Sequence, residues 1–172
     1  MITSEMVKHI QGTLNGLTKG KNTNFGKDED AGASAPTDGI LVVLTDGANV
    51  GALSDSANSK VLASSTVLGK DDVDIFTADD KTINVINIPY SETLSVEAGT
   101  AQGFAIVQVT ATNLKQENIV GSNENADPRK KYIIDNTKLE GCSVLFSGTI
   151  STSQTIELNN SFSLSNIKIT FN

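Results

Sequence analysis

The stretch Gly103–Asn113, GFAIVQVTATN, decides the fold, because it is the longest run in the chain with the composition of a single strand. In an extended chain, successive side chains point to opposite sides of a sheet. Phe104 and Ile106 would lie on one side of this strand, and Ala105 and Val107 on the other. Apolar side chains on both sides predict a strand that is covered on both faces for most of its length.

Shorter strand signals surround this stretch. Gly39–Thr45, GILVVLT, lies between two Asp-Gly pairs and predicts a second, fully buried strand. Further strands are predicted at 60–68, 73–77, 82–90, 92–96, 132–134, 142–150, 155–158 and 161–171, with turns at 78–81 and 151–154. About eight to ten short strands indicate a mainly β, antiparallel β-sandwich, jelly-roll-like or Ig-like, with a small barrel as the alternative.

The last segment changes its apolar period part-way along. Phe162 and Leu164 share one parity, whereas Ile167 and Ile169 share the other. A regular strand would send the two pairs to opposite faces. We therefore expect a β-bulge near Ser165-Asn166 that restores a common inward face.

The N-terminal part differs from the rest. Residues 1–18 have apolar side chains at spacings of three and four, which predicts an amphipathic helix, and residues 19–38 have the Gly, Ala, Ser and charged composition of a linker. The predicted division is an arm at residues 1–38 and a β-sandwich domain at 39–172. The arm is either a helical plug or a disordered tether.

The apolar stripe of this helix is a candidate partner-binding surface, formed by Met6, Ile10, Leu14 and Leu17. A helix of this length is marginal alone in water, so its stripe must dock on something. The two candidates are its own domain and a neighbouring subunit.

Charge and composition exclude several functions. The net charge is −7 and the 13 Lys and Arg residues are spread along the chain, so the basic footprint of a nucleic-acid binder is missing. No stretch reaches the roughly 18 apolar residues of a membrane span, and no signal peptide is visible. We expect a soluble protein, made in the cytoplasm, with no nucleic-acid or membrane partner.

Catalytic and metal-binding residues are scarce. The acidic cluster Asp71, Asp72 and Asp74 is a weak candidate for calcium, because such ions need about six to eight converging oxygens. One histidine, His9, and one cysteine, Cys142, cannot form a zinc site of the usual kind. The sequence therefore predicts a non-enzymatic protein without cofactor.

The pattern resembles virion structural proteins of tailed bacteriophages, of the head-decoration, head-fibre or neck-associated type. The resemblance is carried by the helical plug Ile2–Leu17, the linker Gly26–Pro36, and the Thr-, Asn- and Ser-faced strands Thr82–Ile88 and Ser161–Phe171. It implies location in the virion after synthesis in the host cytoplasm. It also implies attachment to capsid or neck through the N-terminal arm, and assembly with copies of itself and other virion proteins.

A ligand-binding module is the alternative function. A β-sandwich that binds carbohydrate, or a calcium-dependent adhesin, would need exposed aromatic platforms beside polar loops. Tyr90 and Tyr132 are the only tyrosines, and the chain has no tryptophan.

Overall fold

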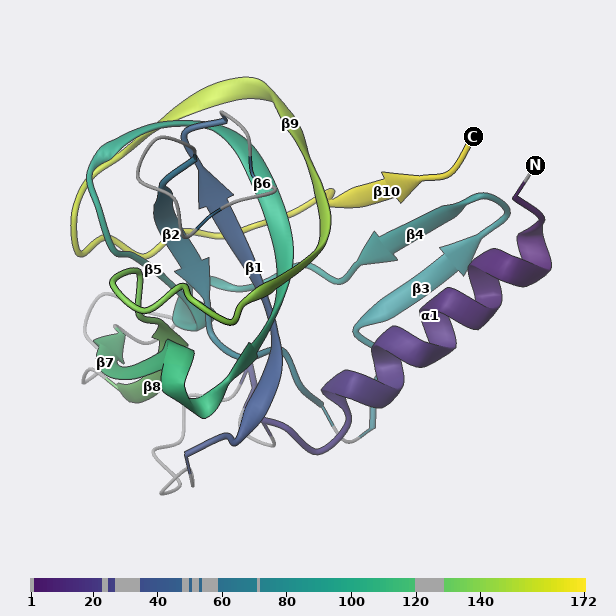
Figure 1. Cartoon of the computed structure of the whole chain (residues 1–172), viewed down its shortest axis with the longest axis horizontal. Coiled ribbons are helices and arrows are strands. Elements are labelled where there is room, and N and C mark those ends of the chain that lie inside the picture. Colours follow the sequence, from purple (N-terminus) through teal and green to yellow (C-terminus); the bar gives the residue numbers. More distant parts are fainter. Residues whose placement is uncertain are drawn as a thin grey trace.

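The computed structural model describes residues 2–22, 25–26, 35–47, 50, 53, 59–70, 72–119 and 129–172 (Figure 1). The chain is mainly β, with one N-terminal α-helix, and its paired strands are all antiparallel. The predicted class, an antiparallel β-sandwich preceded by a short helix, is confirmed. The largest sheet ends in two separate edge strands, so it is not a closed barrel.

The described strands form three sheets. The five-stranded sheet has the order β5-β2-β1-β6-β9, the three-stranded sheet the order β10-β4-β3, and β7 pairs with β8. The strand bounds are β1 Asp38–Thr45, β2 Val61–Ser65, β3 Phe76–Asp79, β4 Thr82–Val85, β5 Thr93–Ser95, β6 Gly99–Thr110, β7 Leu114–Ile119, β8 Arg129–Ile134, β9 Ser143–Ile156 and β10 Lys168–Thr170.

The two apolar runs of the sequence lie side by side inside the large sheet. All eight residues of β1 pair with β6, from Asp38 opposite Thr110 to Thr45 opposite Gly103. One face of this pair belongs to a cluster that contains Ile40 and Ile106, and the other face to a second cluster with Val107. The prediction of a strand covered on both faces is confirmed.

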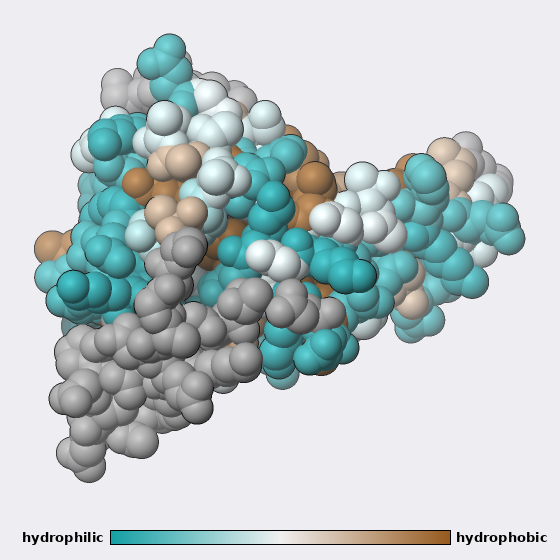
Figure 2. Space-filling model, turned by 90° about the horizontal axis from the view of Figure 1, so that it is seen from below, coloured by the Kyte–Doolittle hydropathy of each residue, from teal (hydrophilic) through white to brown (hydrophobic). Residues whose placement is uncertain are grey.

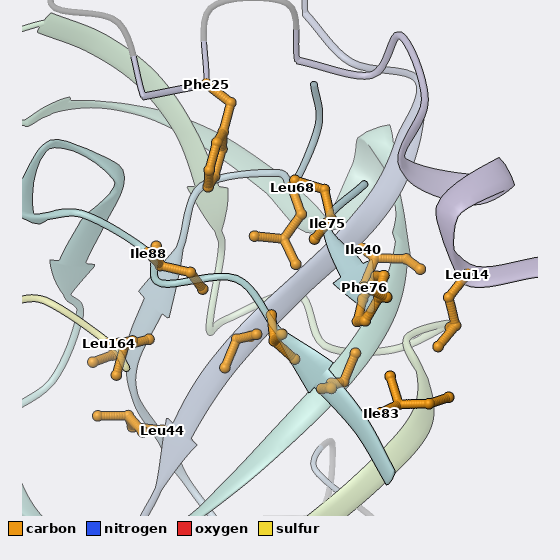
Figure 3. Close-up of a cluster of buried hydrophobic side chains, with 14 of the residues drawn as sticks. Leu14, Phe25, Ile40, Leu44, Leu68, Ile75, Phe76, Ile83, Ile88 and Leu164 are labelled. Atoms are coloured by element: carbon orange, nitrogen blue, oxygen red, sulfur yellow. The ribbon is translucent and has the colours of Figure 1, made fainter. Parts of the chain in front are cut away.

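The α-helix α1, Ser4–Thr18, packs against the three-stranded sheet, mainly on β3. Its first turn is capped by Thr3, whose hydroxyl accepts a 3.3 Å hydrogen bond from the Met6 backbone N–H. Val7 and Leu14 point into the core, and Figure 3 shows Leu14 beside Phe76. The apolar stripe of α1 is thus covered largely by its own chain.

Phe25 anchors the segment after the helix. Its side chain is 1% exposed and lies near Leu68 and Ile88 in the same cluster (Figure 3). Burial of an aromatic side chain of this kind contributes about 1.5–3 kcal/mol. Half of the predicted linker lies outside the described residues, and the division at residue 38 stays a prediction. The helix, Phe25 and β1 nevertheless share one hydrophobic cluster.

The hairpin predicted around residues 151–154 is wrong, because these residues belong to the single long strand β9. We expected a turn at 151–154, but β9 continues along β6 to Ile156. The register shifts between Ala101, opposite Gln154, and Gly103, opposite Thr149. β9 has more residues than β6 between these two pairs, and they form an irregularity in the strand. β6 is long enough to pair with β9 on both sides of this irregularity.

The C-terminal segment changes its inward face where predicted. Leu164 is buried, Ser165 and Asn166 are exposed, and Ile167 is half-buried; Asn166 has φ 58°. Leu164 forms a bridge with Ile88, and β10 pairs with β4. The predicted common inward face is confirmed.

The irregularity in this segment is not a bulge, however. Ile88 bridges Leu164 and Asn84 pairs with Lys168, so four positions separate the two pairs on each strand. The equal spacing means that neither strand carries an additional residue relative to the other.

Strand β7 was missed by the sequence reasoning. The stretch after Asn113 is polar, and the sequence reasoning assigned no strand to it and interpreted its core, 121–131, as loop. Instead Leu114–Ile119 pairs with β8 along its whole length. Its polar side chains gave no apolar alternation to detect.

The helix, the β3-β4 hairpin and β10 extend away from the five-stranded sheet as a projection (Figure 1). Both termini lie at the far end of this projection. Seen from below, the projection carries mostly hydrophilic surface, with hydrophobic surface near the point where it joins the body (Figure 2).

Candidate functional site

The outer edge of β9 is the most accessible strand edge of the molecule. β9 pairs only with β6 and ends the five-stranded sheet (Figure 1). Within the described residues, the backbone of Ser143–Ile156 makes no hydrogen bond besides its ladder with β6. Backbone donors and acceptors on the outer side of such a strand can pair with a further strand.

The shape of β9 limits where such pairing can occur. A second register shift lies between Ile106, opposite Phe146, and Val107, opposite Val144. Leu145 is the additional residue there, and it joins Phe146 on one side of the sheet, while Val144 lies on the other. The regular part of β9 between the two irregularities is 146–149.

Charge is absent from β9. No ionisable side chain other than the thiol of Cys142 occurs between Glu140 and Glu157, and the strand contains no proline. Natural proteins commonly protect exposed edges with charged residues, proline or short strands. β9 uses none of these, and within the described part of the chain its two irregularities are the protection that this edge has.

The opposite edge of the large sheet, β5, is covered. The Ser95 backbone N–H donates to the Asn160 carbonyl at 2.9 Å, and the Asn160 N–H donates to the Ser95 hydroxyl at 2.8 Å. Thr93 similarly accepts from the Phe162 N–H at 2.9 Å. The first bond occupies a backbone group that a foreign strand would need, and the two hydroxyl bonds hold residues 160–162 against this edge.

The edge of β3 is sealed by the helix. The Asn15 side chain donates to the Phe76 carbonyl at 2.8 Å and accepts from the Phe76 N–H at 2.9 Å, as an adjacent strand would. Gln11 donates to the same carbonyl at 2.9 Å. An amide side chain therefore takes the place of a neighbouring strand.

The remaining edges are short or charged. β10 has only three residues and includes Lys168. β7 carries Lys115 and Glu117, whose charged groups lie 3.0 Å apart. β8 begins with three consecutive basic residues and its Ile133 already forms a bridge with Thr66 at the end of β2. Among the described strands, β9 alone is long, uncharged and open.

The predicted partner-binding residues are placed as follows. Met6 is exposed at 51%, Ile10 and Leu17 are half-buried against the chain's own core, and Leu14 is buried at 4%. Only Met6 is therefore well placed for a partner, and the contact expected for Leu14 is made within the chain. Contact of Met6 with another protein stays a prediction.

The structure describes two of the three predicted metal residues. Asp72 and Asp74 are exposed, and Asp71 lies outside the described residues. Across the part of the chain that the structure describes, no three His, Cys, Asp or Glu side chains come together as metal ligands. Calcium binding by this cluster is still untested by the geometry.

A buried ion pair was not predicted. The Glu92 carboxylate, fully buried, contacts the Lys131 ammonium and accepts from the Thr66 hydroxyl. It also accepts a 2.8 Å hydrogen bond from the Gly26 backbone N–H, which ties the segment after α1 to the core. Spacings in the sequence offered no signal for this network, because its members come from four distant segments.

Perturbed ionisable groups have structural causes. The hydrogen bond from Lys21, at 2.5 Å, lowers the pKa of Asp38. Burial acts to raise the pKa of Asp135. The hydrogen bonds from the hydroxyl and the backbone N–H of Thr137 outweigh burial, so the pKa of Asp135 is lowered overall. Burial raises the pKa of the Cys142 thiol to about 11, which keeps it protonated and unreactive.

A pocket of about 540 Å³ beside β9 could hold a small ligand. It lies between Ile150 and Gln154 of β9 on one side and Leu164 and Ile167 on the other. Phe104 supplies its aromatic surface, whereas both tyrosines lie elsewhere. Carbohydrate binding stays an open alternative.

Comparisons with protein-family models, with curated proteins and with solved structures each find no match to this chain. Of the described helices, none is both long and apolar enough to cross a membrane.

Proposed function

We propose that this protein is a non-enzymatic structural component that works as an assembly of its own copies, as the resemblance to bacteriophage virion proteins implies. The observation that supports the proposal is the open edge of β9. An uncharged strand of 14 residues with an unpaired side is a ready template for association.

The projection is the proposed point of attachment to other virion proteins. Met6 near the start of α1 is exposed at 51%, and Val73, which lines a pocket with the C-terminal half of α1, is exposed at 49%. Because the rest of the helical stripe is covered by the chain's own hairpin, attachment would use this outer surface of α1. In this respect the proposal departs from an arm that inserts its whole stripe into a neighbour.

Sedimentation velocity of the full chain over a wide concentration range tests self-assembly. We expect the average mass to rise with concentration, because the edge is open in the single chain. A protein that stays monomeric at every concentration overturns the proposal. If that monomer is also stabilised against heat by calcium or glycans, the ligand-binding alternative is supported.

Location in the virion needs its own test. Mass spectrometry of purified phage particles from the same source should detect the chain in stoichiometric amounts. Particles without it would overturn the virion assignment and leave the self-assembly result unaffected. The variant Met6→Ser should reduce incorporation into particles, with the exposed Thr13→Ser on the same helix as the control.

A further inference from the structure

We infer that two copies of this chain pair β9 with β9 in antiparallel orientation about a two-fold axis, which closes the assembly as a dimer. The inference rests on the proposed self-assembly and specifies its partner and symmetry. It joins two five-stranded sheets into one continuous sheet.

The first step is that the described strands offer one suitable open edge. β5 is covered by residues 157–162, β3 is sealed by Asn15, and β7, β8 and β10 are charged, bridged or short. A second copy therefore offers one suitable described edge to the first, which is its own β9.

The second step is symmetry. A head-to-tail assembly needs two different complementary edges on each subunit, and it grows into rings or filaments. A subunit with a single open edge can pair only with the same edge of a second copy. Both open edges are then paired, so the assembly does not grow beyond a dimer. Antiparallel pairing of identical strands has this two-fold symmetry.

The third step is charge. The chain has a net charge of −7, so two copies repel each other over most of their surfaces. Between Glu140 and Glu157 there is no charge to repel. An acidic partner copy can approach most easily along this stretch.

The fourth step is the side chains of β9. The exposed Ser147 and Thr149 lie in its regular part, where hydroxyl side chains on paired strands can hydrogen-bond across the interface. Leu145, Phe146 and Ile150 are half-buried and would gain cover from a second subunit. The regular part is short, so we expect a dimer that dissociates on dilution.

Distance measurements between spin labels test the pairing directly. Single nitroxide labels are placed at Ser143, Ser147 and Thr149 of β9 in a Cys142→Ser background, with the exposed Thr77 on β3 as the control. About 3.4 Å of rise per residue means that the distance between equivalent labels grows by about 6.8 Å per residue from the axis. We expect the shortest distances within β9 and a long distance at Thr77.

An edge substitution gives an independent measurement on nearly native protein. Ser147→Lys places two like charges near the axis, so we expect the dimer dissociation constant to rise at least tenfold, measured by sedimentation equilibrium. Thr77→Lys, at another exposed strand position, should leave the dimer dissociation constant unchanged. Circular dichroism of both variants checks that they fold.

The outcomes separate this inference from the proposed function. A dimer whose label distances are constant along β9, or shortest at Thr77, overturns the inference and leaves self-assembly in place. Trimers or filaments that Ser147→Lys abolishes overturn the closed two-fold symmetry alone. A monomer at all concentrations overturns both.

Discussion

The buried ion pair between Glu92 and Lys131 should make the fold sensitive to the loss of either charge. The Glu92 side chain has no exposed surface and the Lys131 side chain is 6% exposed. Replacing Lys131→Met removes the ammonium group and keeps an unbranched side chain of similar length. The Glu92 carboxylate would retain the Thr66 hydroxyl and the Gly26 N–H as donors, but lose this counter-charge.

The magnitude follows from the burial. Removing one partner of a buried pair leaves an uncompensated charge and costs about 3–5 kcal/mol. In a chain of this size each kcal/mol lowers the melting temperature by about 2–4 °C, so we expect a decrease of about 6–20 °C. Urea unfolding, with the midpoint and slope analysed together, measures the free energy directly.

The double substitution Glu92→Gln with Lys131→Met separates charge from packing. The amide oxygen that replaces the Glu92 carboxylate can still accept from the Gly26 N–H, and both charges of the pair are removed together. We expect stability to return to within about 1–2 kcal/mol of the original protein, because a neutral replacement of a buried pair is often tolerated.

An exposed ion pair provides the matched control. Lys60 and Glu97 approach to 3.5 Å with side chains 57% and 42% exposed. Lys60→Met should change stability by less than about 1 kcal/mol. Our reasoning is refuted if Lys131→Met is equally mild, or if the double variant is no more stable than Lys131→Met alone.

Three further predictions concern local features. Gly12→Ala should stabilise the protein by about 0.5–1 kcal/mol in urea unfolding, since a Cβ there meets open space on α1. Gly103→Ala should destabilise the protein by about 1–3 kcal/mol, because its Cβ would lie 3.1 Å from the Gly148 carbonyl oxygen. Equal effects of the two substitutions would contradict both predictions. Asn15→Ala should lower the free energy of unfolding by about 1–3 kcal/mol and speed amide hydrogen exchange at the β3 edge. Unchanged exchange would show that the helix does not protect this edge. At pH 8, Cys142 should react with iodoacetamide about 100-fold more slowly than a free thiol, because its pKa of about 11 leaves little thiolate. The reaction rate should rise as the pH increases toward 11. An ordinary rate at pH 8 would show that the thiol is not buried.

The sequence by itself determined the features that depend on local period and turn chemistry. The apolar runs fixed β1 and β6 and showed that both faces of these strands would be covered. The turn residues placed the β3-β4 hairpin, which closes at Asp80 and Lys81. The change of parity at 165–166 located the irregularity before β10. Each of these signals lies within a few neighbouring residues.

Only the tertiary structure decided how these elements meet. The sequence gives no strand order, so it could not show that β9 is an edge, or that Asn15 seals β3 from 61 positions away. It also could not place Phe25 in the core or pair Glu92 with Lys131. The physical reason is that burial and hydrogen bonding between distant segments select one arrangement, whereas side-chain period is identical in every strand order.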